Sequence, residues 1–418
     1  MSQAHAIRRR EPGASRVVGG LPAPSRPWGA PAANEPDGAV SLYVHMPYCA
    51  HRCAFCDLTA GPPAGQHEPL AYLTALRREI VRAVEEEPEL SGRPALTAYF
   101  GGGTPTAVQP EGLAGVLWLL RQQFGLPDGA EATVEADPAT VDREALWALH
   151  QAGFTRVSFG VQSLDDGVLR RIGRLHDADR ARAAVAWAQE EGFGQVSVDL
   201  ILGLPGVSPQ TWRATVEEVA GWGIGHVSVY ALQVEEGTAF GRRQRAGMLH
   251  LPPDDLVVEM GDEAEAILAH AGFGRYELSS YARPGARCAH NEGYWTGRAY
   301  RGFGAGAHSY IDGERRWNVR APRRYVNTVV SGRSPVDGRE RLEPGHAAAE
   351  AAVLALRRDR GIERKAFAAA FGRDPLETFG PALDRLAEAG LVAVGAQGAT
   401  LTARGRWLYN QVAAALLP

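Results

Sequence analysis

Cysteine is scarce in this sequence, which holds four cysteines in 418 residues. Three of them, Cys49, Cys53 and Cys56, fall within one short stretch, which does not resemble the disulfide framework of a secreted protein. There is also no apolar run of about 18 residues, which a membrane-spanning helix would need. The N-terminus lacks the apolar segment of a secretory signal. The sequence therefore predicts a cytoplasmic protein without a membrane span, in which bunched cysteines favour metal.

The chain also lacks a large excess of either charge, because its net charge is only −4. A chain with so little net charge, and with no strong basic stripe, is not expected to bind nucleic acid. The hydrophobic share of 45% and the charged share of 22% are ordinary for a globular protein with a substantial core. Residues 1–38 are rich in proline, glycine and alanine, and we expect them to form a disordered tail.

From Ser41 onward, strand-like and helical patterns alternate through six strand–helix units. Such alternation predicts an α/β fold with a parallel sheet and right-handed crossovers. Because a complete barrel has eight units, six of them predict a partial, TIM-like (βα)6 barrel. Functional residues are then expected at the carboxyl ends of the strands. The expected strands are 42–44, 95–100, 132–136, 156–161, 195–202 and 226–232.

The most distinctive residues of the chain lie at the carboxyl ends of these strands. They are Cys49, the run from Gly101 to Thr104, Glu135, Gln162 and Asp199. The glycine run lets a ligand approach the backbone closely, although a plain tight turn explains it equally well when it is taken alone. It lacks the lysine of a P-loop. Each carboxylate alone could cap a helix or loop, so the recurrence at one end of the sheet is the informative feature.

The three bunched cysteines suit an iron–sulfur cluster. Three thiolates can hold three irons of a 4Fe–4S cube and leave the fourth iron open, whereas four cysteine ligands are the usual number. A zinc site completed by His45 or His51 is the alternative. Structural zinc usually draws its ligands from two separated pairs, so the spacing favours the cluster without excluding zinc.

The cysteine spacing Cys49-x₃-Cys53-x₂-Cys56, with Phe55 before the last cysteine, and the run Gly101-Gly-Gly-Thr-Pro-Thr106 resemble the radical S-adenosylmethionine (SAM) superfamily. The resemblance covers about residues 40–415. It is strongest to the branch of the oxygen-independent coproporphyrinogen III oxidases and the HemW-type haem chaperones. In this superfamily the open iron binds SAM, and one electron from the cluster cleaves SAM into methionine and a 5′-deoxyadenosyl radical. The resemblance thus implies a 4Fe–4S cluster and SAM as cofactors.

The same resemblance implies a set of SAM-binding residues. Tyr43 and Phe55 are expected to lie against SAM, and Glu135 to hydrogen-bond its ribose or amino group. In the oxidases some of the matching positions serve a second SAM. The full expected set is Tyr43, Phe55, Gly102, Gly103, Thr104, Glu135, Gln162, Arg174 and Asp199, with Ala231 as a looser match. No catalytic residue is assigned.

Two places separate the branches of the family. The oxidases carry a fourth cysteine two residues after the third, whereas Asp57 and Leu58 follow Cys56 here. The stretch from His290 to Trp295, His-Asn-Glu-Gly-Tyr-Trp, resembles the haem-binding motif of the HemW-type chaperones. An imidazole is a good axial ligand for haem iron, with Cys288 as a competing thiolate. A histidine that caps a loop beside two core aromatic residues is the alternative for His290.

The resemblance therefore implies a HemW-type haem chaperone that passes haem to respiratory haemoproteins at the inner face of a membrane. It also implies a homodimer and peripheral docking to the membrane. A coproporphyrinogen III oxidase, or a radical SAM enzyme with another substrate, is the alternative. The expected regions are the barrel at 39–240, a barrel-closing and haem-binding region at 241–340, and a winged-helix-like region at 341–418.

Overall fold

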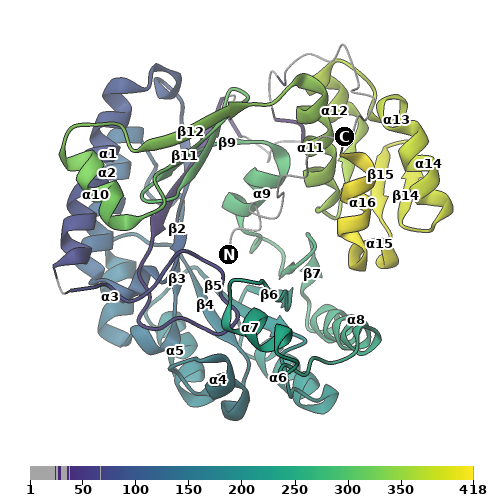
Figure 1. Ribbon diagram of the computed structural model, residues 1–418, viewed down its shortest axis with the longest axis horizontal. Helices are drawn as coiled ribbons and strands as arrows, with labels where there is room; N and C mark the ends of the chain where they lie inside the picture. Colours follow the sequence, from purple (N-terminus) through teal and green to yellow (C-terminus); the bar gives the residue numbers. More distant parts are fainter. Residues whose placement is uncertain (1–23, 25–26, 30–34, 37, 66, 418) are drawn as a thin grey trace.

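The computed structural model describes residues 24, 27–29, 35–36, 38–65 and 67–417. Its centre is one twelve-stranded sheet with the order β12-β11-β10-β9-β1-β2-β3-β4-β5-β6-β8-β7. The sheet curves strongly, with helices α1 to α6 along its outer side and α9 on its inner side (Figure 1). The predicted fold class, an α/β partial barrel followed by a further C-terminal region, is confirmed.

Six parallel strands form the barrel wall, as predicted. They pair in chain order from β1 to β6, and each ends at the same edge of the sheet. Their apolar residues are buried almost completely, as for Leu42 and Val44 on β1. The strands are β1 (Val40–Met46), β2 (Ala95–Gly102), β3 (Glu131–Ala136), β4 (Arg156–Gln162), β5 (Gln195–Leu202) and β6 (His226–Ala231).

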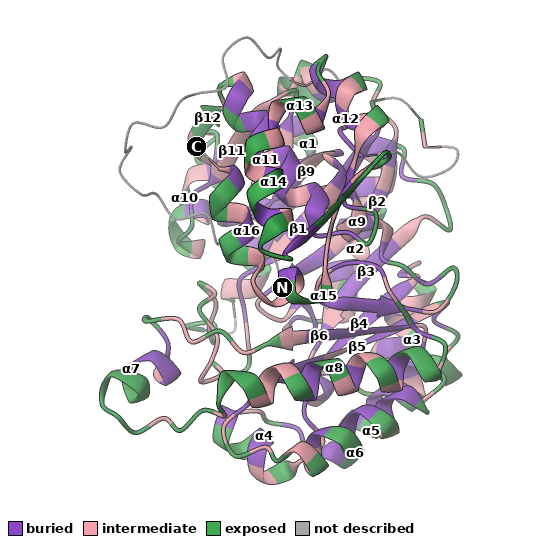
Figure 2. Ribbon diagram, turned by 90° about the vertical axis from the view of Figure 1, so that its right-hand side faces the viewer, coloured by how far each residue is buried: buried purple, intermediate pink, exposed green. Residues whose placement is uncertain are grey.

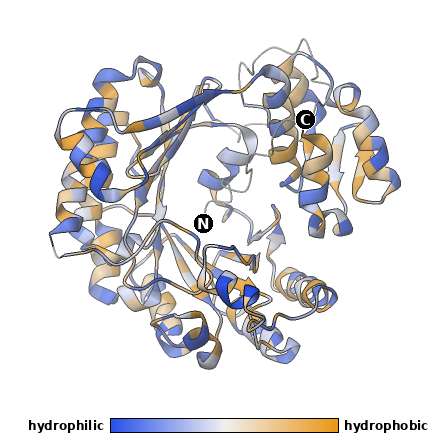
Figure 3. Cartoon of the chain, viewed as in Figure 1, coloured by the Kyte–Doolittle hydropathy of each residue, from blue (hydrophilic) through white to orange (hydrophobic). Residues whose placement is uncertain are grey.

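The outer helices begin and end at residues with clear local reasons. Asp142, Asp165, Asp177 and Ser208 each precede a helix and accept a hydrogen bond from a backbone N–H of its first turn. Figure 3 shows apolar and polar colours alternating along these helices, as expected when one face packs on the sheet. They are α1 (Glu68–Glu86), α2 (Pro110–Phe124), α3 (Arg143–Gln151), α4 (Asp166–Ile172), α5 (Ala178–Glu190) and α6 (Pro209–Ala220), with short 3₁₀ turns at Pro88–Leu90, Pro105–Ala107 and Pro138–Thr140.

Residues beyond the sixth strand extend the sheet at both edges. Strand β9 pairs in parallel with β1, and β10, β11 and β12 continue from it antiparallel. At the other edge β8 and β7 follow β6. The elements are α7 (Ala239–Arg245), α8 (Asp254–His270), β7 (Gly274–Arg275), β8 (Ser280–Ala282), α9 (Ala289–Thr296), β9 (Ala299–Phe303), β10 (His308–Ile311), β11 (Glu314–Asn318), α10 (Pro322–Val330) and β12 (Val336–Arg341).

One buried carboxylate ties this extension to the barrel. Glu79 of α1 accepts hydrogen bonds from Arg301 Nη2 at 3.1 Å and from Asn318 Nδ2 at 2.8 Å. It also accepts from the Tyr325 hydroxyl at 2.6 Å and the Gly304 N–H at 2.9 Å. All its partners lie on the extension, so α1 and the strands β9 and β11 share one buried polar network.

The C-terminal region has its own core and a three-stranded sheet of order β13-β15-β14. A helix, a short strand, further helices and a β-hairpin follow one another, an order typical of winged-helix domains. The elements are α11 (Pro344–Leu356), β13 (Ile362–Glu363), α12 (Arg364–Phe371), α13 (Pro375–Thr378), α14 (Gly380–Glu388), β14 (Val392–Gly395), β15 (Gly398–Leu401), α15 (Ala403–Trp407) and α16 (Tyr409–Leu416).

Most of the predicted disordered tail lies outside the described residues, but two of its side chains are packed against the folded chain. Trp28 is 5% exposed and contacts Tyr310 and Phe371, so it joins the barrel extension to the C-terminal region. Glu35 forms an ion pair with Arg298 at 2.7 Å. The sequence did not predict these contacts, because Tyr310, Phe371 and Arg298 all lie more than 200 residues away from Trp28 and Glu35 in the chain.

Candidate functional site

The predicted cysteine loop directly follows β1, at the carboxyl edge of the sheet. Cys49, Cys53 and Cys56 are free thiols of intermediate exposure. The loop is held by backbone hydrogen bonds from Cys49 N–H to Gly61 O at 3.1 Å and from Ala54 N–H to Ile172 O at 2.9 Å. The second bond attaches the loop to the end of α4, so its position depends on the barrel and not on the loop alone.

The glycine turn after β2 packs against this loop. The N–H groups of Gly103 and Thr104 donate to Met46 O and Tyr48 O, both at 2.7 Å. A Cβ atom on Gly103 would lie 2.5 Å from Tyr48 O and 2.9 Å from Cys49 Sγ, so any larger residue would displace the loop. Gly102 has φ +111°, which side chains rarely adopt. Glycine is therefore required at position 103 by the close approach of the cysteine loop, and at position 102 by the backbone conformation.

The three thiols share one electrostatic environment. Burial, with the nearby Cys53 and Cys49 thiols, raises the pKa of Cys56 to about 11. Burial also raises the pKa of Cys49, and Cys53 adds to that shift. Clustered thiolates are destabilised in this way until a cation or a cluster offsets their charge. Among the described residues, no three His, Cys, Asp or Glu side chains are grouped closely enough to hold a single metal ion.

A buried polar network connects the cysteine loop to the ends of β3 and β4. Arg174 donates from Nη1 to Cys53 Sγ at 3.4 Å and from Nη2 to Gly160 O at 2.6 Å, and pairs with Asp137 at 2.8 Å. Asp137 also faces His176 Nδ1 at 3.2 Å. Burial raises the pKa of Asp137, but the hydrogen bond with His176 and the charge of Arg174 outweigh it and hold the pKa below its usual value. The sequence predicted Arg174 but missed Asp137 and His176, although Asp137 follows a strand that was predicted to end at the site.

On the inner face of the sheet, Tyr99 lies between two of the predicted residues, Tyr43 and Glu135. Glu135 accepts hydrogen bonds from the Tyr99 hydroxyl at 2.8 Å and from the Gly102 N–H at 3.2 Å. The rings of Tyr43 and Tyr99 stack at 6.3 Å between centroids. Because Tyr43 pairs with Tyr99 across β1 and β2, the register of these strands places both rings on one face. A polar and aromatic surface thus begins beside the glycine turn.

The remaining predicted residues line the same edge with different surroundings. Asp199 accepts weakly from Ser158 Oγ at 3.4 Å, and burial raises its pKa. Gln162 is buried with φ +69°, beside an irregularity in the pairing of β4 with β5. Ala231 ends β6 and is exposed. Phe55 is only half-buried and packs against the apolar cluster around α4 and Phe240.

Helix α9, which carries His290 and Tyr294, lies against the inner face of the sheet (Figure 1). Glu131 of β3 accepts from the N–H groups of Ala289 at 2.9 Å and His290 at 2.8 Å, and so fixes the start of this helix. His290 is 0% exposed. Its Nδ1 lies 2.8 Å from Thr97 Oγ1 and its Nε2 lies 2.9 Å from the Tyr294 hydroxyl.

This geometry bears directly on the predicted haem ligand. Burial, with a smaller contribution from the charge of Arg298, lowers the pKa of His290 to about 3, so the ring is neutral at pH 7. A neutral imidazole suits iron, but in this conformation both ring nitrogens are already engaged in hydrogen bonds. Coordination of haem iron by His290 therefore requires the Tyr294 or the Thr97 hydroxyl to leave. Cys288 is buried beside Glu131, and burial raises the pKa of its thiol, which disfavours a thiolate ligand.

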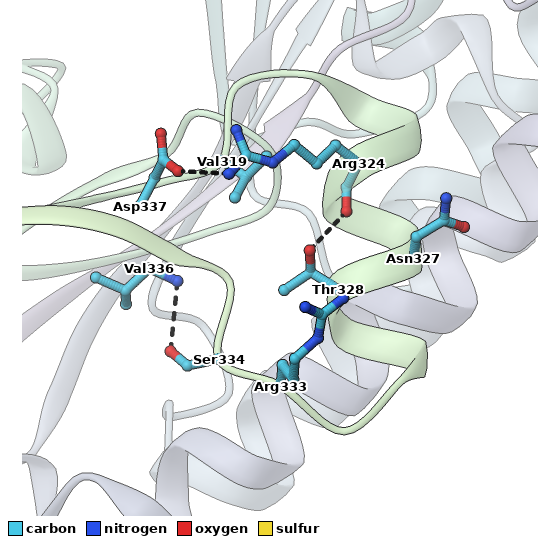
Figure 4. Close-up of a pocket in the computed structure, with 8 residues that line it drawn as sticks. All are labelled: Val319, Arg324, Asn327, Thr328, Arg333, Ser334, Val336 and Asp337. Carbon is cyan, nitrogen blue, oxygen red and sulfur yellow. Dashed lines mark hydrogen bonds and ion pairs between the residues drawn. The ribbon is translucent and has the colours of Figure 1, made fainter.

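Two hollows lie outside this inner face. One, of about 380 Å³, lies between the cysteine loop and the starts of α2 and α3, and Cys49, Thr106 and Thr140 contribute to its lining. The other, of about 460 Å³, lies between α10 and the segment leading into β12 (Figure 4). In it Arg324 pairs with Asp337 at 3.2 Å. The larger hollow contains none of the predicted site residues.

Comparisons with known proteins agree with this arrangement. The chain matches the radical SAM superfamily over residues 43–219 and the HemN C-terminal domain over residues 342–408. It is 38% identical over 394 residues to the heme chaperone HemW of Mycobacterium tuberculosis, with 93% of this chain and 96% of that protein covered. It is 34% identical over 380 residues to the heme chaperone HemW of Bacillus subtilis, which covers 90% and 99% of the two chains.

A solved structure shows the same architecture. Coproporphyrinogen III oxidase (HemN) from Escherichia coli, described as a radical SAM enzyme, superposes with a TM-score of 0.79 at 26% identity, over 92% of this chain and 91% of that one. The superfamily implies SAM and a 4Fe–4S cluster, and the three thiols, next to the glycine turn and Glu135, have the chemistry to hold both. No helix in the described parts of the chain has the length and apolarity to cross a membrane. With its cysteine loop, its barrel and its matching relatives, the chain belongs to the HemW family of the radical SAM superfamily.

Proposed function

We propose that this protein is a haem chaperone, which binds haem and a SAM-ligated 4Fe–4S cluster and delivers haem to respiratory haemoproteins. The main support for a chaperone over an oxidase is the end of the cysteine loop. Asp57 and Leu58 follow Cys56 there, and the fourth cysteine that the oxidases have is absent. The HemW-like motif on α9, inside the curved sheet, supports the same reading. Relatives named heme chaperone HemW match this chain over nearly its whole length, which supports the same proposal.

The cysteine loop and the glycine turn would hold the cofactors. The thiolates of Cys49, Cys53 and Cys56 would ligate three irons, and the polar end of SAM would approach the backbone of Gly102 and Gly103. When bound, the cluster supplies one electron and SAM supplies a carbon-centred radical. Tyr43, Glu135, Gln162, Arg174 and Asp199 are proposed to orient the nucleoside, with Phe55, Thr104 and Ala231 at its margins. Their grouping at one edge of the sheet supports this assignment.

Haem is proposed to bind at α9, with the Tyr294 hydroxyl displaced from His290 Nε2. Tyr294 packs beside Trp295 and edge-on against Tyr300, and these partly buried rings would supply apolar contacts to a porphyrin. The barrel at 39–240 would hold the cluster, and the region at 241–340 would close it and bind haem. The same proposal includes a winged-helix-like region at 341–418. It also includes a homodimer and docking of the protein at the inner face of a membrane.

The test compares haem binding and coproporphyrinogen turnover in one anaerobically reconstituted preparation. The proposal expects a stable Soret band and no decarboxylation of coproporphyrinogen III with SAM and a reductant. The second candidate, an oxygen-independent oxidase, is favoured only by the structural likeness to HemN. Clear conversion to protoporphyrinogen IX would replace the chaperone with that enzyme.

Two substitutions on α9 test the haem site. His290→Ala is expected to weaken haem binding at least tenfold and to shift the Soret band, because the axial nitrogen is lost. Tyr294→Phe is expected to tighten haem binding severalfold, because the hydroxyl that competes for Nε2 at 2.9 Å is removed while the ring stays. Both are read by haem titration, with the exposed His250→Ala as control. An unchanged spectrum and affinity in His290→Ala would exclude this histidine as the ligand.

A further inference from the structure

A small basic and apolar tip projects from the barrel at its carboxyl edge. It comprises α7 and the residues that follow it as far as Leu251, and is called here the α7 tip (residues 239–251). Figure 2 shows α7 standing clear of the rest of the fold. The tip follows the carboxyl end of β6 after residues 232–238, and it lies at the same edge of the sheet as the cysteine loop.

The base of the tip is fixed firmly to the cysteine loop. The Phe240 N–H donates to Ala54 O at 2.9 Å, between Cys53 and Cys56 in the chain. The Phe240 ring is 1% exposed and packs in the apolar cluster formed with Val168 and Leu169 of α4. The projecting position of the tip is therefore part of the packed fold and is coupled to the proposed cluster site.

The surface of the tip combines positive charge with exposed apolar groups. Arg242, Arg243 and Arg245 are all exposed, and residues 239–251 contain no aspartate or glutamate, in a chain whose net charge is −4. Met248 is 66% exposed and Leu251 is 38% exposed. Carboxylates flank the tip on both sides, at Glu235, Glu236, Asp254 and Asp255. The guanidinium groups of Arg242 and Arg245 also donate to backbone oxygens of Gly237 and Glu236.

Two further exposed apolar side chains, Leu175 and Leu70, lie near the cysteine loop. Leu175 is 59% exposed and follows Arg174, whose guanidinium contacts the Cys53 thiol. Leu70, at the start of α1, is 63% exposed, and the backbone of the neighbouring Glu68 accepts a hydrogen bond from Tyr48 beside the cysteine loop. Exposed apolar groups thus occur at separate points around the open edge of the barrel, which suits a flat surface better than a narrow protein groove.

We propose that the α7 tip docks on an anionic lipid surface. The arginines would contact lipid phosphates, and Met248 and Leu251 would enter the head-group region. A convex tip with arginines around exposed apolar residues has the charge and polarity of an interfacial anchor. The purpose of this contact rests on the proposed haem delivery, because it would turn the open edge of the barrel toward a membrane. The proposed function already includes docking at a membrane, and the α7 tip is the surface that would make this contact.

Vesicle co-sedimentation of the full chain tests the proposal. Wild-type protein is expected to bind vesicles of equal phosphatidylcholine and phosphatidylglycerol, and to bind phosphatidylcholine vesicles at least tenfold more weakly. Each arginine near an anionic surface contributes about fivefold to the partition coefficient, so R242Q/R243Q/R245Q should lower it by more than tenfold. Raising the salt concentration should lower it further toward the phosphatidylcholine value.

Matched variants separate this surface from general effects. R360Q/R373Q/R385Q removes the same charge from exposed positions of the C-terminal region and should leave binding unchanged. Met248→Ser should weaken binding severalfold, whereas Trp118→Ser, at an equally exposed position on α2, should not. Equal binding of wild-type protein to both vesicle types, or equal losses in the two arginine triples, would overturn the proposal. Haem titration of the same preparations tests the proposed function separately. A protein that binds vesicles but no haem would refute the haem chaperone and leave the lipid-binding surface standing.

Discussion

Cys53→Ser is expected to abolish stable 4Fe–4S loading. The hydroxyl of serine is a poor ligand for a cluster that depends on three thiolates, and the loop offers no fourth cysteine to replace the lost one. Reconstituted wild-type protein should hold about four irons per chain and absorb broadly near 400 nm, and the variant should retain less than about one iron. Iron analysis and the absorption spectrum measure the loss, and SAM binding should fall with it.

The fourth cysteine of the chain provides the control for this experiment. Cys288 is buried at the start of α9, outside the cysteine loop, and its thiol donates a hydrogen bond to Glu131 at 3.5 Å. Cys288→Ser should therefore leave iron content and the absorption unchanged. If wild-type protein instead retains stoichiometric zinc and cannot be loaded with iron, the cluster assignment fails for the whole loop. A Cys288→Ser variant that also loses iron would show that the ligand set has been misassigned.

Glu79→Ala is expected to cause a large loss of stability. Glu79 and Arg301 each have only 2% of their side chains exposed, and they pair at 3.1 Å. Removing one partner of a buried pair leaves the other charge uncompensated, which typically costs about 3–5 kcal/mol. Arg301 keeps a second partner in Glu87, so we expect a loss near the lower end, about 3 kcal/mol. Chemical denaturation followed by fluorescence measures it.

A neighbouring acidic residue on the same helix isolates the effect of burial. Glu86 pairs with Arg82 at 2.9 Å, but its side chain is 54% exposed. Glu86→Ala should change the free energy of unfolding by less than about 0.5 kcal/mol, because solvent screens exposed pairs. Equal changes in the two variants would contradict the view that Glu79 holds the β9–β12 extension. Protection of β9 amides from hydrogen exchange should fall in Glu79→Ala alone.

Much of the barrel follows from local patterns. The six parallel strands were predictable because each is a short apolar run that alternates with an amphipathic helix. Their carboxyl edge was predictable because parallel strands all end on one side. The cysteine loop and the glycine turn were therefore expected to be neighbours, and the structure places Gly103 and Cys49 in contact. Local periodicity and the rules for connecting parallel strands are therefore enough to predict the barrel strands and their common edge, without knowledge of side-chain packing.

The sheet extension and the surroundings of His290 required the tertiary structure. Strands β9 to β12 are short, and their pairing depends on long-range partners such as Glu79 and Arg301. Trp28 also lay in a stretch whose composition predicts disorder, yet its ring packs against Tyr310 and Phe371. Composition describes what a segment can bury by itself, whereas these residues are ordered by surfaces that other parts of the chain provide.

The sequence by itself determined what the proposed cluster site can offer: three cysteines in one loop without a fourth, and a glycine turn after the next strand. These features depend only on residue identity and spacing, so they can be recognised without knowledge of the tertiary structure. Only the tertiary structure decided how the predicted haem ligand is presented. His290 faces Thr97 and Tyr294 inside the curved sheet, and both of its nitrogens are held by hydroxyl groups. The physical reason is that a buried polar ring must find hydrogen-bond partners, and which partners it finds depends on strand register and helix placement rather than on the motif.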